Sequence, residues 1–189
     1  MEDAWIYAPL PAGLRELEAL HPWVAAAIIE RFAPPGGTVL DPMAGSGVIG
    51  ETASRLRRYA YLADLKPQHP HIRAWDVLRI DELFVENKVD LAVLHPPSFE
   101  HWRAGHRDFV ELDYLNFLSD ALAALNDCVT PGGHLIAITR PDRSAGRVID
   151  TITPLLQGFK EACTLSDYLI AQASDGREHW HILVSKKES

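Results

Sequence analysis

Cysteine is scarce in this sequence, and long apolar runs are missing. Only Cys128, in a helical pattern, and Cys163, in a predicted strand, occur among 189 residues, which excludes a disulfide framework. No run approaches the roughly 18 apolar residues of a membrane-spanning helix. Residues 1–20 also lack the apolar segment of a secretory signal. We therefore expect a protein of the reducing cytoplasm with no membrane partner.

Basic side chains are outnumbered by acidic ones. The chain has 18 Lys and Arg against 26 Asp and Glu, which gives a net charge of −8. Modules that bind nucleic acid on their own are usually basic, so this charge argues against tight autonomous binding. A local basic patch can still work within an acidic protein, so a nucleic-acid substrate stays open.

A complete set of metal ligands is also missing, although nine histidines are present. His69 and His71 are two residues apart, as are His179 and His181, a spacing that places each pair on one face of a strand. No cysteine or acidic set completes a tetrahedral site around either pair. We predict no metal.

Short runs rich in Val, Ile and Leu alternate with longer helical patterns along most of the chain. This alternation predicts an α/β fold with a largely parallel sheet wrapped by helices. The helical patterns cover 21–33, 46–58 and 113–129, and the strand patterns 38–41, 59–64, part of 71–77, 89–94, 134–140, 162–173 and 179–186. The last two strands flank the turn signal Asp175-Gly176 and should pair antiparallel. We expect one domain over 21–189 after an N-terminal extension over 1–20.

The stretch VLDPMAGSGVIG, residues 39–50, joins a predicted buried strand to a helix through a glycine turn. Gly45, Gly47 and Gly50 match the spacing of dinucleotide-binding turns, in which glycine permits a sharp bend and close approach of a ligand. A phosphate-binding P-loop is excluded because no Gly-Lys-Ser or Gly-Lys-Thr follows. Asp41, at the mouth of the turn, suits a cationic amino-acid group or sulfonium better than a pyrophosphate.

Acidic residues stand at the carboxyl ends of three consecutive predicted strands. They are Asp41, Asp64 and Asp76. Ligands of open α/β sheets bind at that edge, and an acid after the second strand often meets ribose hydroxyls. The alternative is that these residues are ordinary loop acids or helix caps.

The stretch DLAVLHPPSFEHW, residues 90–102, ends an apolar run at His95, Pro96 and Pro97. Two prolines stiffen a loop, so groups within it can be held ready for a substrate. The alternative is a plain loop cap with a hydrogen-bonded histidine. Residues 99–114 then interleave aromatic and basic side chains, as stacking on an unpaired base requires, or as a loop anchored to the core would show.

Read together, these two stretches resemble the S-adenosylmethionine-dependent amino-methyltransferases, the family that includes adenine-N6 and cytosine-N4 DNA methylases. The family's cofactor motif, DPFxGSG, is matched by Asp41, Pro42, Gly45, Ser46 and Gly47, with Met43 at the Phe position and Ala44 at the variable one. Its catalytic motif has Asp, Asn, Ser or His, then two prolines and an aromatic residue. The chain matches it at His95, Pro96 and Pro97, but has Ser98 in the aromatic position and Phe99 one residue later.

The resemblance implies a class I methyltransferase fold, which is a Rossmann-like seven-stranded sheet with an antiparallel C-terminal hairpin and helices on both faces. It also implies that S-adenosylmethionine is the cofactor. The implied cofactor contacts are Asp41, Pro42, Met43, Ala44, Gly45, Ser46, Gly47, Asp64, Leu65, Asp76, Val77 and His95. Within this set, Asp64 would meet the ribose and Asp76 the adenine.

The implied catalytic residues are His95, Pro96, Pro97, Ser98 and Phe99. A neutral His95 and the Pro96 carbonyl would accept the two hydrogens of a target amine, which keeps the lone pair on nitrogen. The ring of Phe99, or of Trp102, would replace the missing aromatic and stack on the substrate.

The resemblance favours an exocyclic amine of a DNA base as substrate, followed by RNA and then a protein amide. The core fold leaves no room for a target-recognition domain, so we expect a separate specificity subunit, a homodimer, or a structured RNA or protein as the substrate. Two other classes stay open. One is a degenerate subunit that keeps the fold without transferring methyl groups, and the other is a nicotinamide-dependent oxidoreductase, which only the glycine spacing supports.

Overall fold

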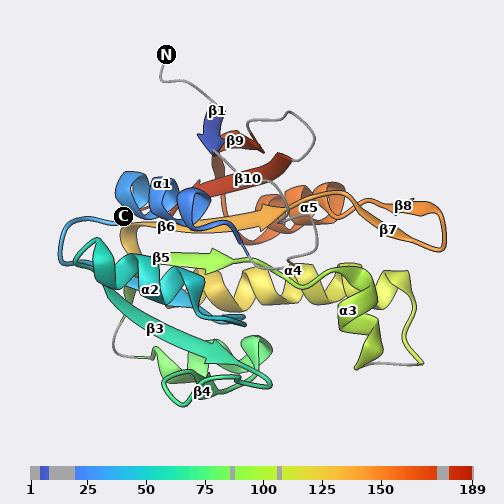
Figure 1. The fold of residues 1–189 in the computed structure, drawn as a ribbon, viewed down its shortest axis with the longest axis horizontal. Coiled ribbons are helices and arrows are strands. Elements are labelled where there is room, and N and C mark those ends of the chain that lie inside the picture. The colour runs from blue at the N-terminus through green and yellow to red at the C-terminus, as the bar shows by residue number, and fades with distance from the viewer. Residues whose placement is uncertain (1–4, 9–19, 86–87, 106–107, 174–178, 189) are drawn as a thin grey trace.

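The computed structural model describes residues 5–8, 20–85, 88–105, 108–173 and 179–188, and Figure 1 shows their arrangement around one large sheet. The strands are β1 (Trp5–Ala8), β2 (Thr38–Asp41), β3 (Tyr59–Asp64), β4 (Arg73–Ala74), β5 (Val89–Leu94), β6 (Val129–Thr139), β7 (Asp142–Ser144), β8 (Arg147–Ile149), β9 (Leu165–Ala173) and β10 (His179–Lys186). The helices are α1 (Pro22–Phe32), α2 (Val48–Arg55), the short 3-10 helix η1 (Val77–Leu83), α3 (Phe99–Ala104), α4 (Glu111–Cys128) and α5 (Ile152–Ala162).

The large sheet has eight strands in the order β1-β9-β10-β6-β5-β2-β3-β4. Strands β2 to β6 pair in parallel, whereas β10 lies antiparallel between β6 and β9. The predicted α/β fold with a mostly parallel sheet and an antiparallel C-terminal pair is therefore confirmed. Seven of the strands are those predicted from the sequence, and β1 adds an eighth beside β9. It comes from the segment predicted as an N-terminal extension.

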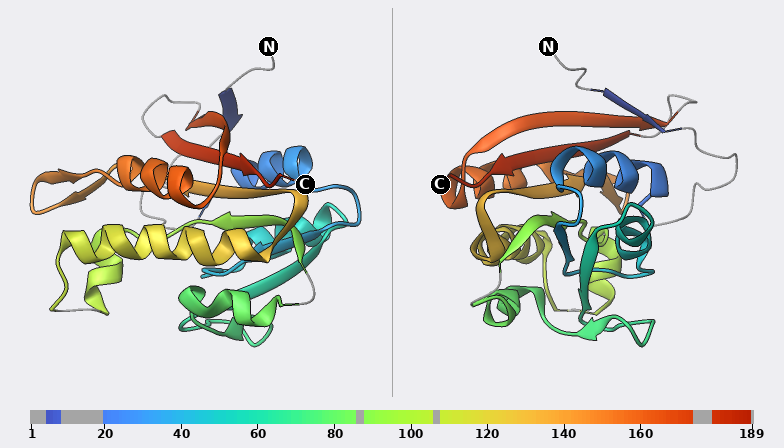
Figure 2. Two further views of the ribbon diagram at one scale, coloured as in Figure 1. Left: turned by 180° about the vertical axis from the view of Figure 1, so that it is seen from behind. Right: turned by 90° about the vertical axis from the view of Figure 1, so that its left-hand side faces the viewer.

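Helices cover both faces of this sheet (Figure 2). Strand β5 shows why both are needed, because its side chains alternate between two apolar cores. Leu91 and Val93 lie with residues of α1 and α2, whereas Ala92 and Leu94 lie with residues of α4 and α5. A strand buried on both faces reads as the continuous apolar run seen in the sequence.

A polar pair joins β2 and β5 at the beginning of both strands. Asp90 Oδ2 accepts hydrogen bonds from Thr38 N at 2.7 Å and from Thr38 Oγ1 at 3.0 Å. Asp90 N donates in turn to Thr38 Oγ1 at 3.1 Å. In the adjoining register Val39 stands opposite Leu91 and Leu40 opposite Ala92.

Helix α5 occupies a segment to which the sequence analysis assigned no element, and it corrects the place of Cys163. This residue follows the end of α5, and the next strand begins at Leu165, so the prediction that Cys163 lies in a strand was wrong. Helix propensity is weak here because Gly158 is unfavourable in a helix interior, whereas Pro154 lies in the first turn, where its missing N–H removes no helical hydrogen bond. Tertiary packing decides instead: a Cβ at Gly158 would lie 3.0 Å from Leu122 Cδ1, so the glycine lets α5 pack tightly against α4.

The segment after β6 forms a second sheet of two strands. Strands β7 and β8 pair antiparallel through the turn residues Ala145 and Gly146, both with positive φ. The turn signal Asp175-Gly176 lies outside the described residues, although the strands on either side of it do pair antiparallel. Among the described helices, none combines the length and the apolar character needed to cross a membrane.

Candidate functional site

The two loops predicted to form the site follow neighbouring strands at the point where the strand order reverses. From β2 the chain continues to β3 on one side, while β5, on the other side of β2, belongs to a later part of the chain. Ligands of open α/β sheets bind at such a switch point, beyond the carboxyl ends of the strands. The glycine turn follows β2 there, and the loop that begins with His95 follows β5.

The glycine turn needs its glycines for two different reasons. Gly45 and Gly47 have φ of +48° and +82°, the left-handed region in which side chains are strained. Gly50 has an ordinary backbone, but a Cβ there would lie 2.4 Å from Leu62 Cδ1. The first two glycines therefore shape the turn, and the third lets α2 pack closely on β3.

Asp64, the last residue of β3, holds the glycine turn in place. Its Oδ2 accepts a hydrogen bond of 2.9 Å from Gly45 N, and its Oδ1 accepts one of 2.8 Å from Lys66 N. A second link from Ala44 N to Ala63 O, 2.9 Å long, lies beside it. Asp64, at the end of β3, thus fixes the loop that follows the neighbouring strand β2.

Asp41 is the buried acid of the site, with only 2% of its surface exposed. Burial raises the pKa of its carboxyl group to about 7, and the nearby charge of Asp64 acts in the same direction. A hydrogen bond of 3.2 Å from Met43 N to Asp41 Oδ1 opposes this rise. Among the described residues no cation acts on the pKa of this buried carboxyl group, so a positively charged ligand group would be stabilised beside it.

The other predicted cofactor residues differ in accessibility. Pro42 and Ala44 are buried, Met43 is half-buried, and Ser46 is exposed. Leu65 is exposed, whereas the Val77 side chain lies in the apolar core. Asp76 lies at the beginning of η1, where its Oδ1 accepts a hydrogen bond of 3.0 Å from Leu78 N, so it does act as a helix cap.

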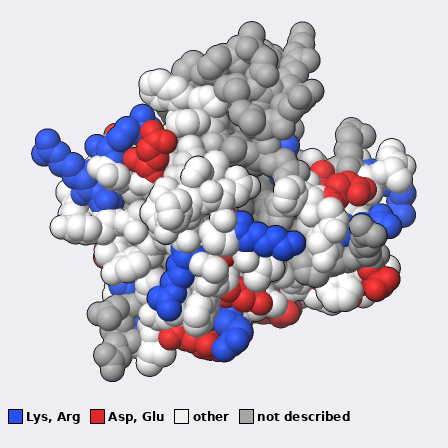
Figure 3. Space-filling model, turned by 60° about the horizontal axis from the view of Figure 1, so that its bottom comes forward, with Lys and Arg blue, Asp and Glu red and all other residues white. Residues whose placement is uncertain are grey.

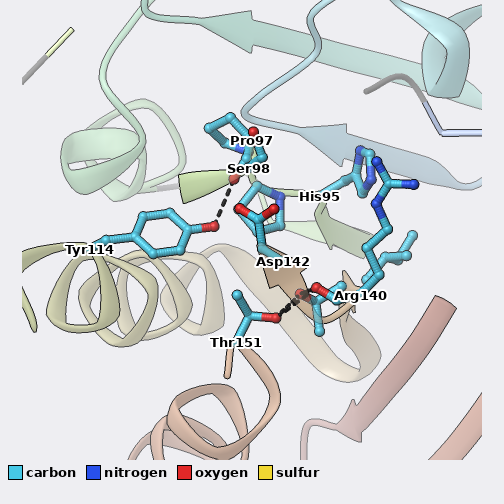
Figure 4. A pocket seen from close by; sticks show the side chains of 10 residues that line it. His95, Pro97, Ser98, Tyr114, Arg140, Asp142 and Thr151 are labelled. Carbon is cyan, nitrogen blue, oxygen red and sulfur yellow. Dashed lines mark hydrogen bonds between the residues drawn. The ribbon is translucent and has the colours of Figure 1, made fainter. Parts of the chain in front are cut away.

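A small pocket opens beside the loop after β5 (Figure 4). Its lining comes from the ends of β5 and β6, from α4 and from the segments on either side of the β7–β8 hairpin. The residues are His95, Pro96, Pro97, Ser98, Tyr114, Ile138, Thr139, Arg140, Asp142 and Thr151. The structure therefore brings four of the five predicted catalytic residues to one pocket.

His95 is uncharged at neutral pH. Desolvation by the surrounding protein, with the positive charge of Arg140 acting in the same direction, lowers its pKa to about 4. A neutral imidazole has one nitrogen that accepts a hydrogen bond and one that donates. The lowered pKa agrees with the neutral His95 that the sequence analysis required, and an unprotonated nitrogen facing the substrate stays a prediction.

Tyr114 is a pocket residue that the sequence analysis missed. Its ring is 1% exposed, and its hydroxyl donates a hydrogen bond of 2.6 Å to Pro97 O. A buried tyrosine hydroxyl needs a partner, and here the partner is the proline loop itself. The available signal was the spacing of Tyr114 with Leu118 and Leu125, which puts a hydroxyl on the buried face of the predicted helix.

The expected stacking role of Phe99 and Trp102 was wrong. Both rings are buried in the core, and their centroids lie 5.6 and 5.3 Å from that of Tyr114. The cause is Ser98, whose Oγ accepts a hydrogen bond of 3.3 Å from His101 N and so begins α3 at this point. Phe99 and Trp102 turn inwards and anchor α3 to α4, as the alternative for residues 99–114 expected, whereas Phe109 is 47% exposed and residues 106 and 107 lie outside the described ones.

The segment after β6 is joined to the beginning of α3. Asp142 Oδ2 accepts a hydrogen bond of 2.5 Å from Phe99 N. Ser144 Oγ also donates a hydrogen bond to Glu100. These contacts hold together the two walls of the pocket, which come from different strands.

Metal-ligating side chains do not cluster in the described part of the chain. No group of three or more His, Cys, Asp or Glu side chains there could hold a metal ion. His69 and His71 do stack, with ring centroids 5.5 Å apart, and no further such ligand is grouped with them among the described residues.

Comparisons with known proteins point to one fold. The chain is 24% identical over 180 residues to the ubiquinone biosynthesis O-methyltransferase of Xanthomonas campestris pv. campestris. The matched region covers 92% of this chain and 67% of that protein. No protein-family model matches the chain.

Solved structures of methyltransferases have a similar fold. TrmN from Thermus thermophilus superposes with a TM-score of 0.67 at 22% identity over 93% of this chain, which spans about half of that protein (51%). The 1,6-didemethyltoxoflavin-N1-methyltransferase of Burkholderia thailandensis superposes with a TM-score of 0.60 at 17% identity, over 88% of this chain and 77% of the other. The chain therefore has the Rossmann-like fold of the class I methyltransferases.

Proposed function

We propose that this protein is an S-adenosylmethionine-dependent methyltransferase that modifies the nitrogen of a planar amine. The observation that carries the proposal is the pocket with a neutral His95 beside Pro96, at the same sheet edge as the glycine turn and Asp41. The names of the similar proteins support the broader part, since they include O- and N-methyltransferases, one of them with bound S-adenosylhomocysteine.

The residues of the glycine turn fit this cofactor. The nearest atom to a Cβ at Gly45 would be Met43 O, at 4.0 Å, and among the described residues no cation is found to act on the pKa of buried Asp41. Asp41 and the turn would hold the positively charged methionine portion, Asp64 the ribose and Asp76 the adenine. S-adenosylmethionine, when bound, supplies an electrophilic methyl group.

His95 and the Pro96 carbonyl would orient the acceptor. An amine conjugated to a ring is a poor nucleophile because its lone pair is delocalised. Two hydrogen-bond acceptors directed at its hydrogens favour the form in which the lone pair stays on nitrogen. Because the loop is stiffened by two prolines and held by Tyr114, these acceptors are already in place, which is how preorganised polar groups accelerate a reaction.

The substrate that carries the amine is proposed from the resemblance of the catalytic motif alone. An exocyclic amine of a DNA base stands first, then RNA, then a protein amide. On the face shown in Figure 3, described Lys and Arg side chains lie among Asp and Glu without forming one basic band. We therefore propose that a nucleic-acid substrate would be bound with the help of a second copy or a separate specificity subunit.

A non-catalytic binding subunit is the second candidate function. It is favoured by Ser98 in the position of the family's aromatic residue, and by the burial of Phe99 and Trp102 away from the pocket. Such a subunit would bind the cofactor without transferring its methyl group.

The deciding experiment measures transfer of labelled methyl from S-adenosylmethionine to parallel pools of DNA, RNA and protein. Calorimetry with S-adenosylmethionine and with NAD is run beside it. Label in one pool that His95→Ala abolishes would establish the enzyme and its substrate class. Cofactor binding without label in any pool would favour the binding subunit. Binding of NAD in place of S-adenosylmethionine would contradict both candidates.

A further inference from the structure

We infer that Arg140 recognises an oxyanion, a carboxylate or a phosphate, carried by the molecule that binds beside His95. The inference rests on the proposed function, because it concerns the acceptor in the same pocket. It goes further by naming a chemical group of that acceptor and the residue that selects it.

Arg140 is placed to contact whatever fills the pocket. It directly follows β6 and lines the pocket together with His95. Figure 4 shows its guanidinium group next to the His95 ring, and its charge is close enough to lower the pKa of that histidine. A ligand amine held by His95 would therefore have a fixed positive charge nearby.

The backbone of Arg140 is held by two buried threonines. Thr151 Oγ1 donates a hydrogen bond of 3.0 Å to Arg140 O, and Thr139 Oγ1 lies 2.6 Å from Thr151 Oγ1. Both threonines are buried. The side chain thus starts from a rigid point, which reduces the entropy lost when it binds a ligand.

No described carboxylate forms an ion pair with Arg140. Asp142, the acid in the pocket lining, already accepts the hydrogen bond from Phe99 N. A guanidinium group presents paired N–H donors that match a carboxylate or phosphate, so the fork of Arg140 is available to a ligand of this kind.

Because the whole protein is acidic, an anionic ligand would have to be attracted by a local positive charge. With a net charge of −8, the chain does not attract an anion by its overall field. One arginine inside a small pocket suits one oxyanion on a planar molecule. That oxyanion can belong to a small aromatic acid or to a nucleotide, two sources that the experiment separates.

The test compares binding of matched probes by calorimetry in the presence of S-adenosylhomocysteine. One pair is 4-aminobenzoate and 4-aminobenzamide, and the other is deoxycytidine 5′-monophosphate and deoxycytidine. We expect the charged member of at least one pair to bind about tenfold or more tightly than its neutral partner, since charged hydrogen bonds are the stronger ones. Preference in the first pair indicates a small acid, and preference in the second a nucleotide phosphate.

Arg140→Gln should abolish this preference. Arg147→Gln, which removes the same charge from the exposed β8 strand, should keep it. If Arg140→Gln does not fold, Arg140→Lys retains the charge but lacks the fork and should show a reduced preference. Equal binding of charged and neutral probes by the wild type, or a preference that survives in folded Arg140→Gln, would overturn the inference.

The same samples separate this inference from the proposed function. A titration with S-adenosylmethionine alone tests the cofactor, and the probes are titrated again without S-adenosylhomocysteine. If the cofactor does not bind but the charge preference remains, the function fails and the role of Arg140 stands. If the cofactor binds and no preference exists, only the role of Arg140 is lost.

Discussion

The hydroxyl of Tyr114 donates a hydrogen bond to the carbonyl oxygen of Pro97, across 17 residues of sequence and between α4 and the loop after β5. This contact ties the loop that contains His95 to the longest helix of the molecule. Because the Tyr114 ring is almost completely buried, the contact cannot be replaced by water without repacking.

Tyr114→Phe is expected to lower both stability and methyl transfer. Loss of the hydroxyl leaves the Pro97 carbonyl without this partner, which costs about 1–3 kcal/mol when the group is buried. Thermal unfolding should therefore occur several degrees lower, and the turnover number should fall more than the affinity for S-adenosylhomocysteine. Tyr168→Phe, at a more exposed tyrosine of β9, is the control. Wild-type turnover by Tyr114→Phe would show that the contact does not position the loop.

Cofactor affinity should rise with pH because of Asp41. The pKa of Asp41 is raised to about 7, so below that pH the carboxyl group must first lose a proton before it can stabilise a cation. We expect S-adenosylhomocysteine, with its ammonium group, to bind roughly tenfold more tightly at pH 8 than at pH 6, as linkage requires. Calorimetry at both pH values measures this difference, and Asp41→Asn should bind weakly with no such dependence.

The same substitution should stabilise the free protein. A carboxyl group whose pKa is raised on folding contributes most stability below its unfolded pKa, and that contribution is lost as the pH rises through the folded pKa. The stability of Asp41→Asn relative to wild type should thus increase between pH 4 and pH 8, by a few kcal/mol. Denaturant unfolding at the two pH values tests this. A constant difference would mean that Asp41 is ionised in the free protein.

His95→Ala should keep cofactor binding and lower transfer by about 100-fold, the scale seen when one preorganised polar group is removed. Since the pKa of His95 is lowered to about 4, the wild-type rate should show no titration of this histidine between pH 6 and pH 8. The pH profile is measured on the acceptor pool that becomes labelled. At saturating S-adenosylmethionine, where Asp41 no longer limits cofactor binding, a rate that falls with an apparent pKa near 6.5 would contradict a neutral His95, whose side chain is half-buried.

Gly50→Ala should destabilise the fold through one clash. Its Cβ would lie 2.4 Å from Leu62 Cδ1, and overpacking of this kind costs roughly 1–3 kcal/mol. The double variant Gly50→Ala with Leu62→Ala removes the clashing methyl group and should be less destabilised than the sum of the two single changes. Denaturant unfolding of the four proteins measures this coupling, and strict additivity would exclude the close contact.

The parts of the fold that follow from sequence are those in which local pattern and tertiary packing agree. The buried run 89–94 is a central strand, and Asp41 and Asp64 end their strands as predicted. The position of His95 in a pocket also follows from its place after a central strand. These features depend on periodicity and chain direction, which a sequence contains.

The parts that were missed depend on distant contacts. Whether the ring of Phe99 faces a ligand or the core is decided by a helix that begins at Ser98 and packs against Tyr114. Strand β1 pairs with β9 in the described structure, and although Trp5, Ile6 and Tyr7 favour a strand, four residues are too few to be assigned from the sequence alone. The proposed roles of Arg140 and Tyr114 likewise arise from side chains that meet across different strands and helices.

The Thr38–Asp90 pair at the beginning of β2 and β5 has a consequence for the opposite end of the sheet. Because β5 is apolar on both faces, sliding it by one residue along β2 would still bury apolar side chains, and hydrophobicity alone resists such a slip only weakly. The hydrogen bonds of the pair select a single register. That register in turn determines how far Asp41 and His95 project beyond their strands. A polar contact remote from any ligand therefore sets the spacing between the two loops on which cofactor and acceptor would meet.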